Sequence, residues 1–279
     1  MAEAPTSDSD LLQEDVRATR VQAFERHLPD RTGTEPTERE VAVERPIALE
    51  FNGIGYAVMM VTPGDLDDFA VGFALSERLI ETREDVVAMD RHETPNGSLL
   101  RVTIVASKLQ AVADRVRHRV SESSCGLCGI ENLEQALRPL PQITSMSAAT
   151  PDHIFLALDT LRARQPLNRR TGAVHAAALC SASGEIRLVR EDVGRHNAFD
   201  KLIGAMARAD RDWNGGFALL SSRCSYELVE KAALANCPML VTISAATDLA
   251  LDRANGCGLR LITLARSDAL LEASAGVSR

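Results

Sequence analysis

The chain has 279 residues, of which 45% are hydrophobic and 25% charged, and its formal net charge is −8. This apolar content is sufficient for one large domain or two modest ones. The acidic balance argues against general nucleic-acid binding, which requires a basic surface.

No apolar run approaches the length of about 20 residues that a membrane-spanning helix needs. Asp8, Asp10, Glu14 and Asp15 interrupt the N-terminus where a signal peptide would be hydrophobic. The six cysteines are too few for a disulfide scaffold in a chain of this size. We therefore expect a cytoplasmic protein with reduced thiols and no membrane contact.

Residues 1–38 are polar and charged, without a sustained apolar period. This composition predicts a flexible tail, with a short helix over residues 11–27.

Residues 39–150 are predicted to form a smaller N-terminal α+β domain. Apolar residues alternate over residues 41–51, Asn52-Gly53 supplies a hairpin turn, and a second strand covers residues 56–61. Thr62-Pro63-Gly64-Asp65 predicts the start of a helix that reaches residue 80, with the Thr62 hydroxyl as its cap. A second strand pair is expected at residues 86–90 and 99–106.

Residues 151–279 are predicted to form a three-layer α/β domain. Helices of ten to fifteen residues alternate here with short aliphatic strands, which indicates parallel pairing. The expected helices cover residues 151–164, 196–209, 225–236 and 246–255. The expected strands cover residues 185–189, 217–221, 239–243 and 259–264.

Cys125-Gly126-Leu127-Cys128 lies in a serine-rich stretch between two helical patterns, where we expect an exposed loop. A structural zinc normally needs a second cysteine pair, and the other four cysteines are isolated in sequence. A zinc deaminase needs His-x-Glu, whereas His175 is followed by Ala176 and Ala177. We therefore expect no metal. Thiol–disulfide cycling and sulfur carriage both remain compatible with the spacing.

A second polar segment, residues 190–201, joins a predicted strand to a predicted helix. It contains Arg195 and His196, and such junctions are common ligand sites in α/β sheets. A capped helix with a solvated charged face is the competing interpretation. The segment 221–225 has the same strand-to-helix position, with Arg223 as a candidate phosphate ligand. His175 alone is more typical of a core histidine.

Taken together, these segments resemble the FdhD family of formate dehydrogenase accessory sulfurtransferases, over residues 40–266. The family's Cys-Gly-x-Cys-Gly loop corresponds to residues 125–129, and its Glu-Asp-Val-Gly-Arg-His-Asn block is intact at residues 191–197. Its Thr-Gly-Gly-x-His block appears at residues 171–175, with Ala173 in place of the second glycine. Residues 221–225 and 244–247 resemble its two serine-containing segments.

The resemblance implies a homodimeric, cytoplasmic sulfur carrier. Such a carrier accepts sulfur from a cysteine desulfurase as a persulfide and transfers it to the bis-molybdopterin guanine dinucleotide form of the molybdenum cofactor, for formate dehydrogenase. Cys125 would bear the persulfide and Cys128 would assist. The C-terminal half would have a cytidine-deaminase-like fold without the zinc chemistry.

The resemblance also implies a cofactor-binding stretch after the last strand, at Leu264, Ala265, Arg266, Ser267, Asp268 and Ala269. The cofactor carries guanine nucleotides with four phosphates, so arginines at strand ends suit it. We therefore include Arg195, His196, Arg223 and His175 in the predicted cofactor-binding set. A thiol–disulfide redox protein and a cofactor-binding chaperone remain as alternatives.

Overall fold

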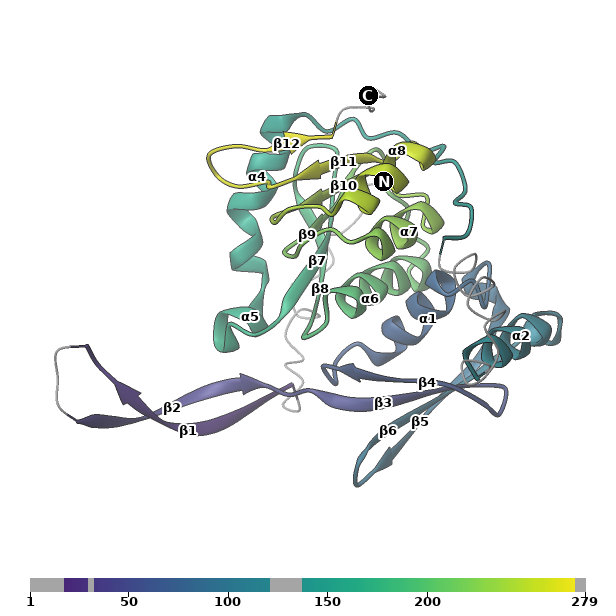
Figure 1. Cartoon of the computed structure of the whole chain (residues 1–279), viewed down its shortest axis with the longest axis horizontal. Coiled ribbons are helices and arrows are strands. Elements are labelled where there is room, and N and C mark those ends of the chain that lie inside the picture. Colours follow the sequence, from purple (N-terminus) through teal and green to yellow (C-terminus); the bar gives the residue numbers. More distant parts are fainter. Residues whose placement is uncertain (1–17, 30–32, 121–136, 274–279) are drawn as a thin grey trace, which may run out of the picture.

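The computed structural model describes residues 18–29, 33–120 and 137–273. Its strands form three sheets, and two halves of the chain pack against each other through helices (Figure 1). Among these residues, no helix has the length and apolar character needed to cross a membrane.

A two-stranded antiparallel ribbon precedes both halves and extends away from the body of the molecule (Figure 1). It consists of β1 (Thr19–His27) and β2 (Thr34–Ala42). The prediction of a helix is therefore wrong for residues 19–27, which form β1. Both faces of the ribbon are largely exposed, so its sequence carries no apolar alternation that would reveal a strand.

The base of the ribbon is attached to the C-terminal half by ion pairing. Arg170 donates from Nε and Nη2 to the two carboxylate oxygens of Glu40, each at 2.7 Å, and from Nη2 to Thr19 Oγ1 at 2.8 Å. A guanidinium bound to both oxygens of a carboxylate fixes direction as well as distance. This contact orients the ribbon relative to α5 (Pro166–Thr171).

The N-terminal half is a four-stranded sheet covered on one face by a helix. The strand order is β4-β3-β6-β5, with β3 parallel to β6 and the other pairs antiparallel. The predicted hairpins are confirmed, with a turn at Asn52-Gly53 and another before Gly97. The elements are β3 (Arg45–Phe51), β4 (Ile54–Val61), α1 (Leu66–Ser76), β5 (Val86–Thr94), β6 (Gly97–Ile104) and α2 (Leu109–Val120).

Thr62 does not cap α1 as predicted. Asp65 occupies the N-cap position with a left-handed backbone, φ 52°, and makes no side-chain cap bond. Thr62 is buried, and its backbone N–H instead donates to Asp192 Oδ2 in the other half of the molecule at 3.0 Å. A local capping rule cannot detect a partner that lies 130 residues away in sequence.

The C-terminal half contains a six-stranded sheet in the order β12-β11-β10-β9-β7-β8. Strands β9, β10 and β11 are parallel, as predicted, whereas β7 is antiparallel to both of its neighbours and β12 is antiparallel to β11. The strands are β7 (His175–Cys180), β8 (Ile186–Asp192), β9 (Phe217–Leu220), β10 (Met239–Thr242), β11 (Arg260–Thr263) and β12 (Leu271–Glu272).

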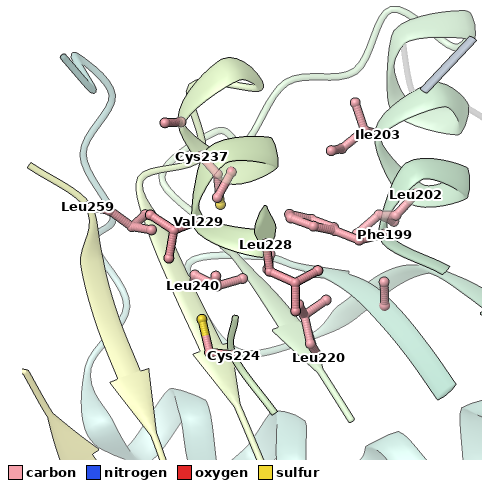
Figure 2. Packing of buried hydrophobic residues seen from close by; sticks show 14 of the residues in the cluster. Phe199, Leu202, Ile203, Leu220, Cys224, Leu228, Val229, Cys237, Leu240 and Leu259 are labelled. Carbon is pink, nitrogen blue, oxygen red and sulfur yellow. The ribbon is translucent and has the colours of Figure 1, made fainter. Parts of the chain in front are cut away.

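Helices cover both faces of this sheet, which makes three layers (Figure 1). One face packs on α4 (Pro151–Leu161), and the other on α6 (Arg195–Arg208), α7 (Tyr226–Leu234) and α8 (Asp248–Cys257). Figure 2 shows the core beneath α6 and α7, where Phe199 and Leu228 meet Leu220 and Leu240. Because both faces are buried, β9 is apolar throughout and β10 is apolar up to its last residue, Thr242, whose hydroxyl donates to Ser244 O at 3.0 Å.

Residues 139–150, which we assigned to the N-terminal domain, run along the C-terminal half. Ile143 N donates to Cys257 O at 2.9 Å, and Ala148 N donates to Gly215 O at 2.8 Å.

The two halves meet where α1 crosses α6. A Cβ atom added to Gly72 would lie 1.8 Å from the carbonyl oxygen of Asp200, and one added to Gly204 would lie 1.9 Å from that of Asp68. The two helix backbones are therefore in direct contact, which only glycine permits at these positions.

We predict that Gly72→Ala destabilises the protein by at least about 3 kcal/mol, the upper range for overpacking, because the obstructing atoms are backbone. The matched control is Gly256→Ala in α8, where an added Cβ meets no atom within 4 Å. Urea unfolding monitored by circular dichroism measures the free energy of unfolding of both variants. Equal stability of the two variants would contradict the close crossing.

Candidate functional site

The carboxyl ends of four strands lie at one edge of the C-terminal sheet. Strand β8 runs in the same direction as β9, β10 and β11, because β7 is antiparallel to both β8 and β9. The segments that follow these strands, and the one that precedes β7, therefore meet at this edge. We call it the strand-end edge, and it comprises residues 172–175, 192–196, 221–225, 244–247 and 264–269.

Main-chain hydrogen bonds hold neighbouring segments of the strand-end edge together. Ser221 N donates to Ala176 O at 3.0 Å, and Ser244 N donates to Ser222 O at 3.2 Å. Leu264 N in turn donates to Ser244 O at 3.3 Å. The structure thus brings the predicted cofactor-binding segments to one edge.

The three arginines predicted to bind phosphate lie on three different segments of this edge. Arg223 and Arg266 are exposed, and no hydrogen bond or ion pair within residues 18–29, 33–120 and 137–273 occupies either guanidinium. Arg195 is half-buried, and its Nε has no hydrogen-bond partner in that part of the chain. These side chains are available to an anionic ligand.

The predicted cofactor-binding stretch after β11 is a turn, closed by a 2.8 Å hydrogen bond from Arg266 N to Ala269 O. Ala265 is fully buried in the core, so its side chain cannot contact a ligand. Leu264 is half-buried with a left-handed backbone, φ 50°. The exposed members of the stretch are Arg266, Ser267, Asp268 and Ala269.

The two histidines of the strand-end edge have different environments. His175 stands opposite Asp192 in the β7–β8 register and is half-buried. Burial lowers the pKa of His175, and the positive charge of Arg195 lowers it further. His196 Nε2 lies 3.1 Å from Ser225 Oγ and 2.9 Å from Glu227 Oε2. The hydrogen bond between His196 and Glu227 lowers the pKa of the Glu227 carboxyl.

Sequence reasoning missed Glu227 as a member of the site. It lies in the first turn of α7, where an acidic residue is ordinary helix chemistry, so no sequence signal marked it.

Most of the polar segment 190–201 is buried and structural. The Asp192 carboxylate is fully buried and accepts four hydrogen bonds, two at each oxygen. The donors are Lys201 Nζ at 2.7 Å, Thr62 N at 3.0 Å, Gly194 N at 2.8 Å and Asn197 Nδ2 at 2.9 Å. Lys201 also donates to Thr62 O at 2.9 Å. This network links the two halves of the molecule.

The other acidic members of the segment are also occupied. Glu191 accepts the backbone N–H groups of Leu167 and Asn168 at the start of α5, at 2.9 and 2.8 Å. Asp200 pairs with Lys231 and accepts a hydrogen bond from Ser76 Oγ at 2.7 Å. Only Arg195 and His196 of this segment are left for the strand-end edge.

The two cysteines of the predicted loop, Cys125 and Cys128, lie outside the described residues. Within the part of the chain that the structure describes, no group of three His, Cys, Asp or Glu side chains is placed to hold a metal ion.

The other four cysteines, Cys180, Cys224, Cys237 and Cys257, are buried free thiols. Their side chains pack in the cores on the two faces of the C-terminal sheet. Cys180, Cys237 and Cys257 thus act as small buried hydrophobic groups.

The model of the FdhD/NarQ family matches residues 42–271. The chain belongs to this family. Among its relatives, the sulfur carrier protein FdhD of Xanthomonas euvesicatoria is 46% identical over 246 residues, which cover 88% of this chain and 87% of that protein. The sulfur carrier protein FdhD of Variovorax paradoxus is 44% identical over 231 residues, covering 83% of each chain.

A solved structure has a similar fold. It is a crystal structure of a candidate formate dehydrogenase accessory protein from Desulfotalea psychrophila, with a TM-score of 0.72 and 22% sequence identity. The similarity covers 92% of this chain and 97% of that one. The mixed α/β architecture is thus common to both proteins.

We predict that Lys201→Met destabilises the protein by about 3–5 kcal/mol, because it leaves the Asp192 carboxylate buried without a counter-charge. The control is Lys108→Met, whose ammonium pairs with the largely exposed Glu81 at 2.6 Å. We expect the control to lose a small fraction of that stability, because solvent screens such pairs. Chemical unfolding of the wild type and the two variants measures the free energies of unfolding. A similar loss of stability in both variants would contradict the role of the buried pair.

We predict that the His175 imidazole titrates below its ordinary value of 6.5, and that Arg195→Met raises this pKa by removing a neighbouring positive charge. As the pH falls, His175 takes up its proton at a higher pH in the unfolded chain than in the folded one. His175 therefore makes the folding stability decrease as the pH drops below about 6.5. Nuclear magnetic resonance titration of the ring measures the shift. Arg187→Met is the control, because Arg187 pairs with Glu185 at the opposite end of β8. An unchanged His175 pKa in Arg195→Met would refute the coupling.

Proposed function

We propose that this chain is a sulfur carrier whose persulfide forms on Cys125. The observation that carries the proposal is the burial of the other thiols, which raises their pKa values. All four cysteines that the structure describes are buried, and burial raises the pKa of Cys224 and of Cys237 to about 12 and also raises those of Cys180 and Cys257. A thiol must ionise to act as a nucleophile, so these four are unreactive. Sulfur chemistry therefore falls to Cys125 and Cys128.

Family membership supports the same assignment, because the similar relatives from Xanthomonas and Variovorax are named sulfur carrier proteins. In the proposed loading step, the Cys125 thiolate attacks the outer sulfur of a persulfide on a cysteine desulfurase. The sulfur–sulfur bond of the donor breaks, the donor cysteine leaves as a thiolate, and Cys125 becomes the persulfide. The sulfur changes carrier without net oxidation or reduction.

The proposed acceptor is the bis-molybdopterin guanine dinucleotide form of the molybdenum cofactor, held as a substrate at the strand-end edge. Arg223 and Arg266 are exposed there without partners among the described residues, which suits the phosphates of a guanine nucleotide. Arg195 adds a third guanidinium. The imidazoles of His175 and His196 lie on the same edge, and His196 contacts Glu227.

Cys128 completes the proposed cycle. Its thiolate attacks the inner sulfur of the Cys125 persulfide, which releases the outer sulfur as sulfide to the acceptor and leaves a Cys125–Cys128 disulfide. Two electrons pass from the thiols to the transferred sulfur in this step. A dithiol reductant then restores both thiols before the next round.

The proposal also includes the wider setting of the reaction. We infer that the carrier acts in the cytoplasm as a homodimer, receives sulfur from a cysteine desulfurase and serves formate dehydrogenase. We further infer that the three-layer C-terminal half is a cytidine-deaminase-like domain adapted to hold a nucleotide. The link to formate dehydrogenase draws support from the description of the Desulfotalea structure as an accessory protein of that enzyme.

We predict that incubation with a cysteine desulfurase and cysteine adds the mass of one sulfur atom to the intact wild-type protein. Cys125→Ala should lose this adduct, because it removes the accepting thiolate. Cys257→Ala is the matched control, since that thiol is buried in the core beneath α8. Intact mass spectrometry under non-reducing conditions measures all three.

Two other outcomes would reject sulfur carriage. If neither the wild type nor Cys128→Ala, which cannot release the outer sulfur by forming the disulfide, gains sulfur while the desulfurase turns over, Cys125 is not a persulfide carrier. If, in addition, the wild type forms a Cys125–Cys128 disulfide, the chain is a thiol–disulfide redox protein that uses the same cysteine pair.

A further inference from the structure

Four arginines gather on a part of the molecule that the strand-end edge does not include. Arg78 follows α1, Arg115 lies in α2, Arg138 begins the segment that leads to α4, and Arg253 lies in α8. We call these residues the four-arginine cluster. They come from four separate stretches of sequence, and no motif connects them.

Main-chain carbonyl groups hold three of the guanidinium groups in place. Arg253 donates from Nη2 to Arg138 O at 2.6 Å, and Arg78 donates from Nη2 to Pro139 O at 3.1 Å. Arg115 donates from Nη2 to Glu77 O at 3.0 Å. Carbonyl oxygens carry no net charge, so these contacts orient the guanidinium groups without neutralising them.

Carboxylates of the described residues compensate only part of this charge. Glu230 pairs with Arg253, and Glu77 Oε2 lies 3.4 Å from Arg115 Nη2. Burial lowers the pKa of Arg78 and of Arg138, and their positive neighbours lower both further. A guanidinium stays charged at neutral pH even so.

The cluster is also short of hydrogen-bond acceptors. The Nε groups of Arg78, Arg138 and Arg253 are buried without a partner among the residues that the structure describes. No side-chain hydrogen bond or ion pair in those residues holds the Arg138 guanidinium, although it is only partly buried. Positively charged donors that are held in place and lack a partner among the described residues are typical of an anion site.

We propose that the four-arginine cluster binds a phosphate-type oxyanion, either as a free inorganic phosphate or as the diphosphate of a nucleotide. The planar guanidinium fork matches the oxygens of a tetrahedral oxyanion, and one such group accepts hydrogen bonds from several arginines at once. The positive charge that the four guanidinium groups share favours an anionic ligand. This site is separate from the strand-end edge and does not depend on sulfur transfer.

The test is isothermal titration calorimetry of the full-length protein with inorganic phosphate, pyrophosphate and GDP. Arg138→Met is the diagnostic variant, because that guanidinium has no partner in the described residues and its loss should leave the fold intact. Losing one charge-assisted contact should weaken binding by about tenfold or more. Arg138→Lys, which keeps the charge but not the fork, should recover part of the affinity.

Two variants separate this site from the others. Arg223→Met removes an arginine of the strand-end edge and should leave Arg138-dependent binding unchanged, as should Cys125→Ala. Inorganic phosphate or pyrophosphate binding that depends on Arg138 indicates a free oxyanion, and GDP binding alone that depends on Arg138 indicates a nucleotide. Absence of binding by all three probes, or binding that Arg138→Met does not weaken, overturns the proposal.

Discussion

The buried ion pair between Asp192 and Lys201 is the contact on which the arrangement of the two halves depends. Both charges are fully buried, and each has a complete set of partners: four donors at the carboxylate, and Asp192 with two main-chain carbonyls at the ammonium. Thr62 from the N-terminal half contributes to both groups. Burying two charges is unfavourable unless every partner is present, so the network tolerates only one relative placement of the halves.

Within one short polar segment, this network separates the residues that hold the structure together from those that we propose bind a ligand. Asp192, Asn197 and Lys201 point into the interface between the halves, whereas Arg195 and His196 remain at the strand-end edge. The strand-end edge therefore rests on a rigid support, which suits the proposed binding of a large anionic substrate. Folding stability and the proposed ligand binding therefore depend on neighbouring residues. A loss of function on substitution in this segment has to be compared with the accompanying loss of stability.

Much of the fold could be predicted from sequence, because its strands and helices follow local rules. The apolar runs of β9 and β10 and the Asn52-Gly53 turn each predicted an element that the structure contains. The β1–β2 ribbon was not predicted, because both of its faces are exposed and its sequence therefore has no alternation of apolar and polar residues.

The candidate site was predictable only in part. Parallel strand order placed Arg195, Arg223 and Arg266 at one edge, since the ends of such strands meet. The roles of Thr62, Glu227 and the four-arginine cluster depend on partners far away in sequence, which no local pattern encodes. Whether a polar residue such as Asp192 faces a ligand or the interior is decided by tertiary packing.

The glycine crossing of α1 and α6 has a mechanical consequence. At Gly72 and Gly204 no side-chain layer separates the two helix backbones. Sliding of packed helices moves one set of side chains past another, and at these two positions it would instead bring main-chain atoms into collision. The crossing therefore opposes a shear motion of the N-terminal sheet relative to the strand-end edge.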